Sequence, residues 1–444
     1  MEGIFTVETN QIFHFIGIKG SGMSALALIL FDEGYTVQGS DVADYFFTQK
    51  GLEDNSVSVY PFDADNITEN MTIILGNAYP DDHPEAVRAK ELGNTIYRYP
   101  EFIDKLMEKY TSLAIAGAHG KTSTTGLIAH VMKNVAATSY LIGDGTGVGN
   151  KDAEYFILEA DEYRGHFLDY YPDYAIITNI DFDHPDFFKD LDHMMEVFQS
   201  FANNVQKGII ACGDDSDVRR LTAEVPIYYY GFGEDNDIRA LNIEKAADHS
   251  AFDVVIKGEN VGRYAIPTFG DHNILNALSA IAFFLLENIS KEEIVKHLMT
   301  YPGVKRRFKE KKVNGQLIVD DYAHHPSEIT ATLDAARQRY PDQQIIAVFQ
   351  PHTFSRLEAL MDEFAESLEK ADIVYVAPIF TSVREKDGNV TSEDLAKKVG
   401  REAKVLDEND MSALMQYRDG VIIFMGAGDI QKYQNKFEDL LSNN

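Results

Sequence analysis

The chain has 444 residues and a formal net charge of −31, from 40 basic and 71 acidic side chains. Such a charge repels nucleic acid and anionic membranes, so we expect neither as a partner, and a polyanionic ligand would need locally basic pockets. Its single cysteine, Cys212, excludes an intramolecular disulfide framework and a cysteine metal cluster. No apolar run reaches the roughly 18 residues of a membrane span, and Met1–Gln11 lacks the pattern of a secretory signal. We therefore expect a cytoplasmic enzyme.

Strand and helix patterns alternate along the whole sequence, which predicts an α/β fold with parallel sheets covered by helices. A chain of this length is expected to form about three domains. We place their boundaries at residues 1–107, 108–305 and 306–444.

The first domain opens with a glycine-rich turn between a strand and a helix. Its predicted strands are Ile12–Ile18, Thr36–Gly39, Thr72–Gly76 and Thr95–Tyr97. The turn, Gly17–Gly22, has the spacing Gly-x-x-Gly-x-Gly and precedes an apolar helix that we expect to be buried. Asp41 follows the second strand, where a ribose-binding acid lies in dinucleotide folds. The turn suits a diphosphate at the helix N-terminus, but close helix–strand packing alone would also explain it.

A second glycine turn opens the central domain and carries the strongest signal. Leu113–Ala116 predicts a strand, Gly117–Gly120 a turn, and Lys121 and Thr122 begin a helix. In such a phosphate-binding loop, backbone N–H groups and a lysine hold phosphate while the hydroxyl reaches Mg²⁺. The loop is shorter than Gly-x-x-x-x-Gly-Lys-Ser/Thr, because Ile115 stands at the first glycine position.

Two acidic clusters follow strands of the same domain. Its further predicted strands are Tyr155–Glu159, Tyr174–Asn179 and Gly208–Cys212. Glu159–Glu162 offers three carboxylates, and Asn179–His184 adds an amide, two carboxylates and an imidazole. Since the carboxyl ends of parallel strands share one edge, both clusters are expected near the phosphate loop, where carboxylates can hold Mg²⁺. The alternative is a pair of surface turns.

The rest of the central domain is expected to be partly antiparallel. Ile227–Phe232, Ala251–Ile256 and Arg263–Ile266 read as antiparallel strands, and the helical stretch 274–288 follows. Asn273 and Asn276 are three residues apart and share a helix face. Their amides can donate to and accept from an adenine edge, although helix capping by Asp271 or Asn273 is an equally simple interpretation.

The last domain begins with a basic run and has two polar strand ends. Arg306 and Arg307 lie in the densest basic segment, and either could neutralise phosphate charge; a solvated linker is the alternative. Asn314-Gly315 predicts a tight hairpin. Strands are predicted at Leu317–Asp320, Gln344–Phe349, Ile373–Ala377 and Val421–Met425. Polar residues follow the first two, in segments 320–326 and 350–356.

Five blocks in this order resemble the Mur ligase family over nearly the whole chain. They are Gly-Ile-Lys-Gly-Ser-Gly-Met-Ser (17–24), Gly-Ala-His-Gly-Lys-Thr-Ser-Thr-Thr (117–125), Gly-Asp-His-Asn-Ile-Leu-Asn-Ala (270–277), Asp-Asp-Tyr-Ala-His-His-Pro (320–326) and Phe-Gln-Pro-His-Thr-Phe-Ser-Arg (349–356). The family usually has threonine where Ala118 and Ser123 stand. The resemblance implies a Rossmann-like N-terminal domain, a central P-loop ATPase-type domain with a mostly parallel sheet and a small antiparallel part, and a Rossmann-like C-terminal domain.

The resemblance also implies an activity. Family members with these signatures join L-alanine to the lactyl carboxylate of UDP-N-acetylmuramate, in peptidoglycan precursor synthesis, with ATP and two Mg²⁺ ions and through an acyl phosphate. Closure of the third domain would shield that intermediate from water. A monomer and a homodimer are both compatible with the sequence.

Site residues carry over from the family by position. Lys121, Glu159, His184 and Arg307 would be catalytic, with Thr122, Glu159 and His184 at the metals. ATP would be held by Gly117, His119, Gly120, Lys121, Thr122, Ser123, Asn273, Asn276, Arg306 and Asp321. The UDP-sugar would contact Gly17, Gly20, Ser21, Gly22, Met23, Ser24 and Asp41. L-alanine would contact Tyr322, His324, His352 and Arg356.

Three other activities fit the sequence less well. A ligase that recycles murein tripeptide onto UDP-N-acetylmuramate shares most blocks, but Glu159–Phe167 and the later Asn-Ile-Asp-Phe-Asp-His-Pro-Asp run resemble the alanine-adding members more. An NAD(P)-dependent dehydrogenase would need another glycine spacing in the first turn. A non-catalytic nucleotide switch would not need two acidic clusters.

Overall fold

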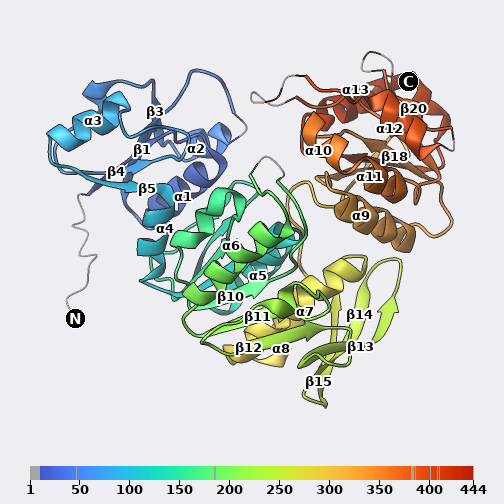
Figure 1. The fold of residues 1–444 in the computed structure, drawn as a ribbon, viewed down its shortest axis with the longest axis horizontal. Coiled ribbons are helices and arrows are strands. Elements are labelled where there is room, and N and C mark those ends of the chain that lie inside the picture. The colour runs from blue at the N-terminus through green and yellow to red at the C-terminus, as the bar shows by residue number, and fades with distance from the viewer. Residues whose placement is uncertain are drawn as a thin grey trace. The chain divides into compact units, whose positions relative to one another are not determined.

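The computed structural model describes residues 11–46, 48–184, 187–381, 385, 387–400, 402–407, 409 and 411–443. Residues 1–10, on which the expected absence of a secretory signal partly rests, lie outside this set. The chain divides into two compact units, and their helices and strands are labelled in Figure 1. The first comprises Met1–Ile180, Met195–Tyr230 and Ser279–His297, and the second comprises Asp181–Met194, Gly231–Leu278 and Leu298–Asn444.

The N-terminal part of the first unit is a five-stranded parallel sheet in the order β3-β2-β1-β4-β5. The strands are β1 Ile12–Ile16, β2 Thr36–Ser40, β3 Ser58–Tyr60, β4 Met71–Leu75 and β5 Thr95–Arg98. The helices are α1 Ser21–Asp32, α2 Gln49–Asp54, α3 Pro84–Glu91 and α4 Tyr99–Met107. All four predicted strands are present, and α1 is buried along most of its length, as predicted. The sequence missed β3, which has three residues and little burial.

The first unit also holds seven strands in the order β12-β11-β10-β6-β9-β7-β8. They are β6 Thr111–Ala116, β7 Thr138–Ile142, β8 Thr146–Val148, β9 Tyr155–Glu159, β10 Tyr174–Ile177, β11 Gly208–Cys212 and β12 Ile227–Gly231. Helix α5 is Lys121–Val135 and α6 is Leu191–Asn204. Strands β7 and β8 are antiparallel, whereas the pairs β7–β9, β9–β6, β6–β10, β10–β11 and β11–β12 are parallel, so this sheet is mixed.

The antiparallel interpretation of Ile227–Phe232 was wrong. Strand β12 pairs in parallel with β11, with Ile209 opposite Ile227. The connection from Gly213 to Pro226 includes the short helix η3 Val218–Arg220, and it is long enough for the crossover that parallel strands require, about a dozen residues. The residues of a strand do not reveal its direction, so the length of the connection is the better guide.

In the second unit, antiparallel strands precede a second Rossmann-like sheet. Strands β13 Ile238–Lys245, β14 Ser250–Ile256 and β15 Glu259–Ile266 pair as antiparallel neighbours. Helices α7 Asp271–Leu286 and α8 Lys291–Leu298 follow in the sequence. Two of these three strands were predicted, and β13 was missed.

The C-terminal sheet has the order β16-β17-β21-β18-β19-β20. Its strands are β16 Lys309–Val313, β17 Gln316–Asp321, β18 Ile345–Phe349, β19 Ile373–Val376, β20 Lys404–Val405 and β21 Val421–Met425. The helices are α9 Pro326–Arg339, α10 Phe354–Ala359, α11 Met361–Leu368, α12 Ser392–Val399 and α13 Ile430–Ser442. The predicted hairpin is confirmed: β16 and β17 are antiparallel, and Asn314 and Gly315 have φ of 45° and 88°, as a two-residue type I′ turn requires.

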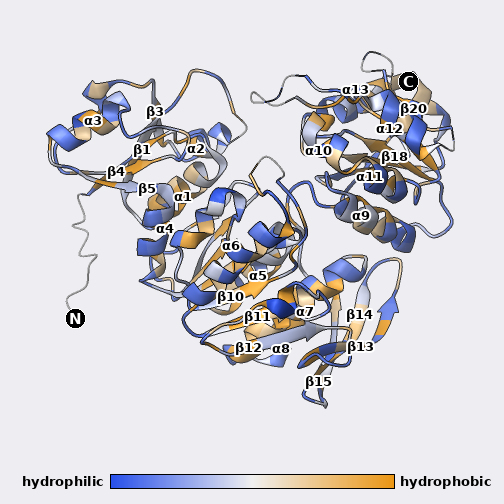
Figure 2. Cartoon of the chain, viewed as in Figure 1, coloured by the Kyte–Doolittle hydropathy of each residue, from blue (hydrophilic) through white to orange (hydrophobic). Residues whose placement is uncertain are grey.

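Both faces of this C-terminal sheet are buried. Val319 and Phe349 pack with apolar residues of α9, α11 and α12, whereas Ile318 and Phe424 pack with those of α13. Neighbouring strand residues point to opposite faces, so Ile318 and Val319 serve different cores. Figure 2 shows the result, with apolar residues along the strands and polar residues on the outward helix surfaces.

The predicted α/β architecture with mostly parallel sheets is confirmed, whereas the exact domain boundaries stay predictions. In the described part of the chain, no helix is both long and apolar enough to cross a membrane.

Candidate active site

The phosphate loop of the first unit lies between β6 and α5. Gly117 and Gly120 have φ of 136° and 83°, which side chains rarely adopt. A Cβ on Gly117 would lie 2.0 Å from the Thr178 hydroxyl, so only glycine fits there. The end of β10 fixes the loop: the Thr178 hydroxyl and the Asn179 amide donate to the His119 carbonyl at 2.6 and 2.9 Å. The loop is therefore held open at the N-terminus of α5, where anions bind.

Lys121 is tied to the protein by an ion pair. Its Nζ lies 2.8 Å from Glu162 Oε2 and also donates to the carbonyls of Gly117 and Ala118. Burial raises the pKa of Glu162 to about 7, although Lys121 opposes that shift. Burial lowers the pKa of Lys121, but the charges of Glu162 and Glu159 outweigh it and raise the pKa overall. Lys121 therefore stays protonated, and a phosphate must compete with Glu162 for it.

Thr122 and Glu159 form a pair of oxygen ligands beside the loop. The Thr122 hydroxyl donates to Glu159 Oε1 at 3.0 Å, and the Gly143 N–H donates to Glu159 Oε2 at 2.7 Å. A Cβ on Gly143 would lie 2.4 Å from either carboxylate oxygen, so any other residue there would displace the carboxylate. Neighbouring oxygens in an octahedral Mg²⁺ site with bonds of about 2.1 Å are about 2.9 Å apart. The pair therefore fits Mg²⁺ in ligand type and spacing.

The first glycine loop is organised around Asp41. Asp41 Oδ2 accepts from the Lys19 N–H at 2.6 Å, and its Oδ1 accepts from the Val42 N–H and the Tyr79 hydroxyl at 2.7 and 3.2 Å. Lys19 Nζ donates to the carbonyls of Val42 and Asp44. Asp41 thus holds the loop in shape, and a ribose would have to share its oxygens. Gly20 precedes the first turn of α1, which contains Ser21, Gly22, Met23 and Ser24.

In the second unit, Arg356 and His352 lie near the segment that carries His184. Arg356 Nη2 donates to Asp183 Oδ1 at 2.7 Å, and both side chains are buried. The His184 N–H also donates to Asp183 Oδ1. Burial, aided by the charge of Arg356, lowers the pKa of His352 to about 4, so its imidazole is neutral. Pro185 and Asp186, part of the run that resembles alanine-adding members, lie outside the described residues.

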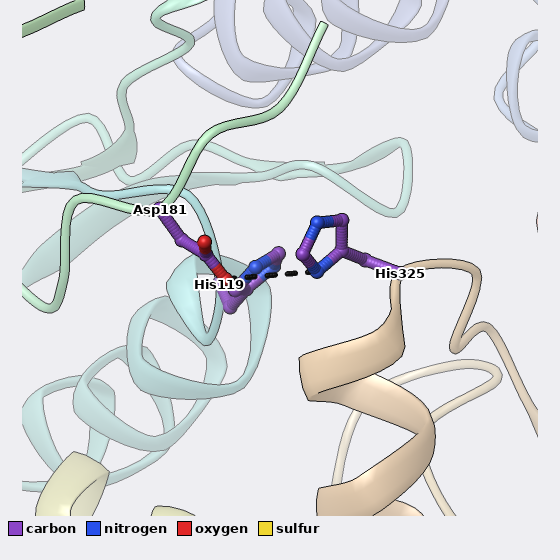
Figure 3. A group of neighbouring side chains, drawn as sticks. All are labelled: His119, Asp181 and His325. Atoms are coloured by element: carbon purple, nitrogen blue, oxygen red, sulfur yellow. Dashed lines mark ion pairs between the residues drawn. The ribbon is translucent and has the colours of Figure 1, made fainter. Parts of the chain in front are cut away.

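Asp181 contacts the start of α9 in the same unit. The Ser327 hydroxyl donates to Asp181 Oδ2 at 2.7 Å, and His325 Nδ1 lies 3.6 Å from that oxygen, the ion pair drawn in Figure 3. His119, labelled in the same figure, belongs to the phosphate loop of the first unit. Helix α9 begins at Pro326, and His325 is its N-cap, accepting from the Ser327 N–H. Asp181 therefore contacts residues at the beginning of α9.

The basic run after residue 304 packs on one aromatic ring. The guanidinium groups of Arg306 and Arg307 lie 4.9 and 5.2 Å from the centre of the Tyr322 ring. Arg306 also donates to the Gly426 carbonyl, and Arg307 lies 3.3 Å from Glu328. The run is thus built into the fold and is not a solvated linker.

The polar residues after β17 and at the start of α7 are also held by the fold. Asp321 accepts from the N–H groups of Phe308 and Ala323, both at 2.8 Å, and burial raises its pKa. His324 lies 3.0 Å from Glu328. Asn273 donates to the Phe269 carbonyl at 2.7 Å, and Asn276 lies one turn later on α7, with only 6% of its surface exposed.

The structure thus brings predicted site residues together in three groups. Lys121, Thr122 and Glu159 meet in the first unit, whereas His184, His352 and Arg356 meet in the second. Arg306, Arg307 and Tyr322 form a third cluster, also in the second unit. The sequence did not single out Glu162 as the partner of Lys121, nor Lys19 and Tyr79 as the residues that shape the first loop. The sequence did offer a reason to consider Glu162 as that partner, because it is the last carboxylate of the first acidic cluster.

Known proteins provide an independent comparison. The chain matches the models of the Mur ligase family catalytic domain over residues 12–111, the Mur ligase middle domain over 115–284 and the Mur ligase glutamate ligase domain over 306–428. It is 55% identical over 437 residues to the UDP-N-acetylmuramate--L-alanine ligase of Ligilactobacillus salivarius, covering 98% of this chain and 99% of that protein. It is also 55% identical over 433 residues to the enzyme of that name from Lactiplantibacillus plantarum, with coverage of 98% and 99%.

Solved structures agree with that comparison. The UDP-N-acetylmuramate-alanine ligase from Thermotoga maritima is similar with a TM-score of 0.79 and 26% identity, covering 97% of this chain and 99% of that one. A murein peptide ligase from Psychrobacter arcticus has the same fold, with a TM-score of 0.67, 23% identity and coverage of 98% and 99%.

Proposed function

The chain belongs to the Mur ligase family, and we propose how its residues perform the reaction of UDP-N-acetylmuramate–L-alanine ligases. The enzyme joins L-alanine to UDP-N-acetylmuramate at the expense of ATP in peptidoglycan synthesis. The observation that carries the proposed chemistry is the loop at Lys121 and Thr122, with Glu159 3.0 Å from the Thr122 hydroxyl. It combines an anion-binding helix end, a lysine and an oxygen pair suited to Mg²⁺.

ATP binds with its β- and γ-phosphates on the phosphate loop. The N–H groups at the start of α5 and the ammonium of Lys121 face the phosphates, and Lys121 leaves Glu162 to reach them. Asn273 and Asn276 contact the adenine, and Asp321 lies near the ribose. Arg306 and Arg307 neutralise phosphate charge, and because both lie against Tyr322, either guanidinium can serve.

Thr122 and Glu159 would hold one Mg²⁺, and His184 would support the second. When bound, the metal neutralises charge on the phosphoryl group during its transfer. Glu159 is oriented by the Gly143 N–H, which fixes its second oxygen. The fold therefore prepares this carboxylate before any ligand binds.

The acceptor carboxylate must be activated because a carboxylate anion is a poor acylating agent. Its oxygen attacks the γ-phosphorus of ATP, the bond to the β–γ bridging oxygen breaks, and ADP leaves with that electron pair. Lys121 stabilises the transferring phosphoryl group in the resulting acyl phosphate. The L-alanine amine then attacks the acyl carbon and inorganic phosphate leaves. Closure of the third domain excludes water from that intermediate.

L-alanine binds near His352 and Arg356. Arg356 exchanges the Asp183 carboxylate for the carboxylate of the amino acid. The neutral imidazole of His352 accepts a hydrogen bond from the amino group, and Tyr322 and His324 line the same site. The UDP moiety binds on the first loop, with its diphosphate over Gly20 and Gly22.

The test is phosphate release by the purified protein with ATP, Mg²⁺ and UDP-N-acetylmuramate, with L-alanine or murein tripeptide as acceptor. Turnover with L-alanine and none with the tripeptide supports the proposal. Turnover with the tripeptide and none with L-alanine would make the chain a recycling ligase. The same preparation, fractionated by size with light scattering, would decide between a monomer and a homodimer, and cell fractionation would test the proposed cytoplasmic location.

A further inference from the structure

Two tyrosines flank the first glycine loop. Tyr79 follows β4, and its ring lies where a Cβ on Gly17 would be, with the ring carbon Cε2 2.2 Å from that position. Tyr99 is the first residue of α4 and directly follows β5. Its hydroxyl oxygen lies 2.7 Å from the position of a Cβ on Gly22. Since the carboxyl ends of parallel strands share an edge, both rings reach the loop after β1.

The two hydroxyl groups differ in what they contact. The Tyr79 hydroxyl donates to Asp41. The Tyr99 hydroxyl makes no hydrogen bond to any residue that the structure describes, although its ring is partly buried. Tyr99 is only partly buried, and its hydroxyl group is a donor that none of the described residues uses.

The surroundings of Tyr99 keep it protonated. Burial, together with the negative charges of Asp161 and Glu159, raises the pKa of Tyr99 far above its ordinary value. The phenol therefore remains a neutral donor at physiological pH. As a neutral group, the phenol does not itself repel an anion.

The ligand for this donor is defined by the end of α1. The first N–H groups of a helix have no partner inside the helix and favour an anion. In α1 the first internal bond is donated by Ser24, to Gly20, so Ser21, Gly22 and Met23 precede it. The Tyr99 hydroxyl lies against Gly22, on the same helix end.

We propose that the Tyr99 hydroxyl donates a hydrogen bond to the diphosphate of the UDP-sugar, alongside the N–H groups at the start of α1. The proposal rests on the proposed function for the identity of the ligand. Gly22 and Tyr99 form a matched pair, because any side chain at residue 22 would displace the hydroxyl.

This contact would also connect the diphosphate to the metal ligands. The Ser21 hydroxyl, next to Gly22, donates to the Gly143 carbonyl at 3.4 Å, and the Gly143 N–H donates to Glu159. A diphosphate held by Tyr99 would therefore lie on a loop that contacts Gly143, the residue whose N–H orients Glu159. The sugar attached to it would start close to the residues that activate its carboxylate.

The test compares the wild type with Tyr99→Phe and with Tyr97→Phe as the matched control. Tyr97 lies two residues earlier on β5, and its ring packs against Phe102. Steady-state kinetics give KM for UDP-N-acetylmuramate, ATP and L-alanine, and UDP alone is titrated by calorimetry. Removing a hydrogen bond to a charged group should weaken binding about 10-fold or more.

We expect Tyr99→Phe to raise KM for UDP-N-acetylmuramate and the Kd of UDP by the same factor, with KM for ATP and L-alanine unchanged. Tyr97→Phe should match the wild type throughout. An unchanged Kd for UDP in Tyr99→Phe would overturn the proposal, and so would a larger KM for ATP. Because UDP binding needs no turnover, a wild type that binds UDP without ligating L-alanine would count against the proposed function only.

Discussion

The two glycine loops of the first unit use their lysines in opposite ways. In the loop after β1, Lys19 is buried and donates to the carbonyls of Val42 and Asp44. In the loop after β6, Lys121 pairs with the carboxylate of Glu162, and the next residue, Thr122, contacts Glu159. The first lysine therefore shapes a loop, whereas the second is held by a charge that a phosphate can replace. The first loop is suited to holding a diphosphate and the second to transferring a phosphoryl group.

Lys121→Met should have the largest effect on activity. Loss of the ammonium that stabilises transferring phosphate should lower kcat on the order of 10³-fold, and because it leaves the buried Glu162 carboxylate without its partner, it should also lower thermal stability. Phosphate release and thermal unfolding would be measured together. The control is Lys133→Met on the exposed side of α5, which should retain wild-type turnover. Full activity in Lys121→Met would remove the contrast between the two lysines.

Glu159→Gln should come next, because it removes a metal ligand and keeps the size of the side chain. We expect the Mg²⁺ concentration for half-maximal activity to rise by about 10-fold or more. Mutating even the residues that only support metal ligands lowers metal affinity or activity by roughly 10–100-fold. A Mg²⁺ titration of the activity measures it. Glu154→Gln, just before the same strand and exposed, serves as the control. An identical Mg²⁺ dependence in both variants would exclude Glu159 as a ligand.

Glu162→Gln should change how stability depends on pH. The pKa of Glu162 is raised from 4.5 to about 7, so the folded protein binds more protons than the unfolded chain between those values. The free energy of unfolding of the wild type should therefore fall as pH rises from 4.5 to 7, by up to about 3 kcal/mol. The glutamine variant lacks this contribution, so its stability relative to the wild type should increase over that window. Parallel pH profiles of the two proteins would contradict the raised pKa.

Lys19→Met should have the smallest effect on catalysis. The loss of two hydrogen bonds from a buried ammonium should lower the free energy of unfolding by about 2 kcal/mol, while kcat at saturating substrates stays near the wild-type value. Urea unfolding and steady-state kinetics would measure the two quantities. A fall in kcat comparable with that of Lys121→Met would mean that the first loop also takes part in phosphoryl transfer.

Local signals in the sequence predicted much of the fold. The type I′ turn at Asn314-Gly315 and the strand before Gly117 were read correctly because both depend on a few neighbouring residues. Strand β12 was assigned the wrong direction, because direction depends on the connection to β11 and cannot be told from the residues of the strand itself. Strands β7 and β8 were missed, although β7 packs against both α1 and α5.

In the candidate site, too, only the features that depend on neighbouring residues could be predicted. Glu159 and Thr122 could be placed from their positions at a strand end and a helix start. Tyr79 and Tyr99 could not, because they come from strands β4 and β5 and meet the glycine loop only in the folded sheet. Asp41 was predicted to bind a ribose, and the sequence could not indicate that the Lys19 and Val42 N–H groups already occupy its oxygens.

The central claim, that ATP activates the acceptor carboxylate at the Lys121 loop, can be tested by following one oxygen atom. UDP-N-acetylmuramate labelled with ¹⁸O in its lactyl carboxylate would be turned over with ATP and L-alanine, and the released phosphate analysed by mass spectrometry. If an acyl phosphate forms, each phosphate derived from a fully labelled carboxylate carries one ¹⁸O. Unlabelled phosphate, with normal formation of the L-alanine product, would contradict the account.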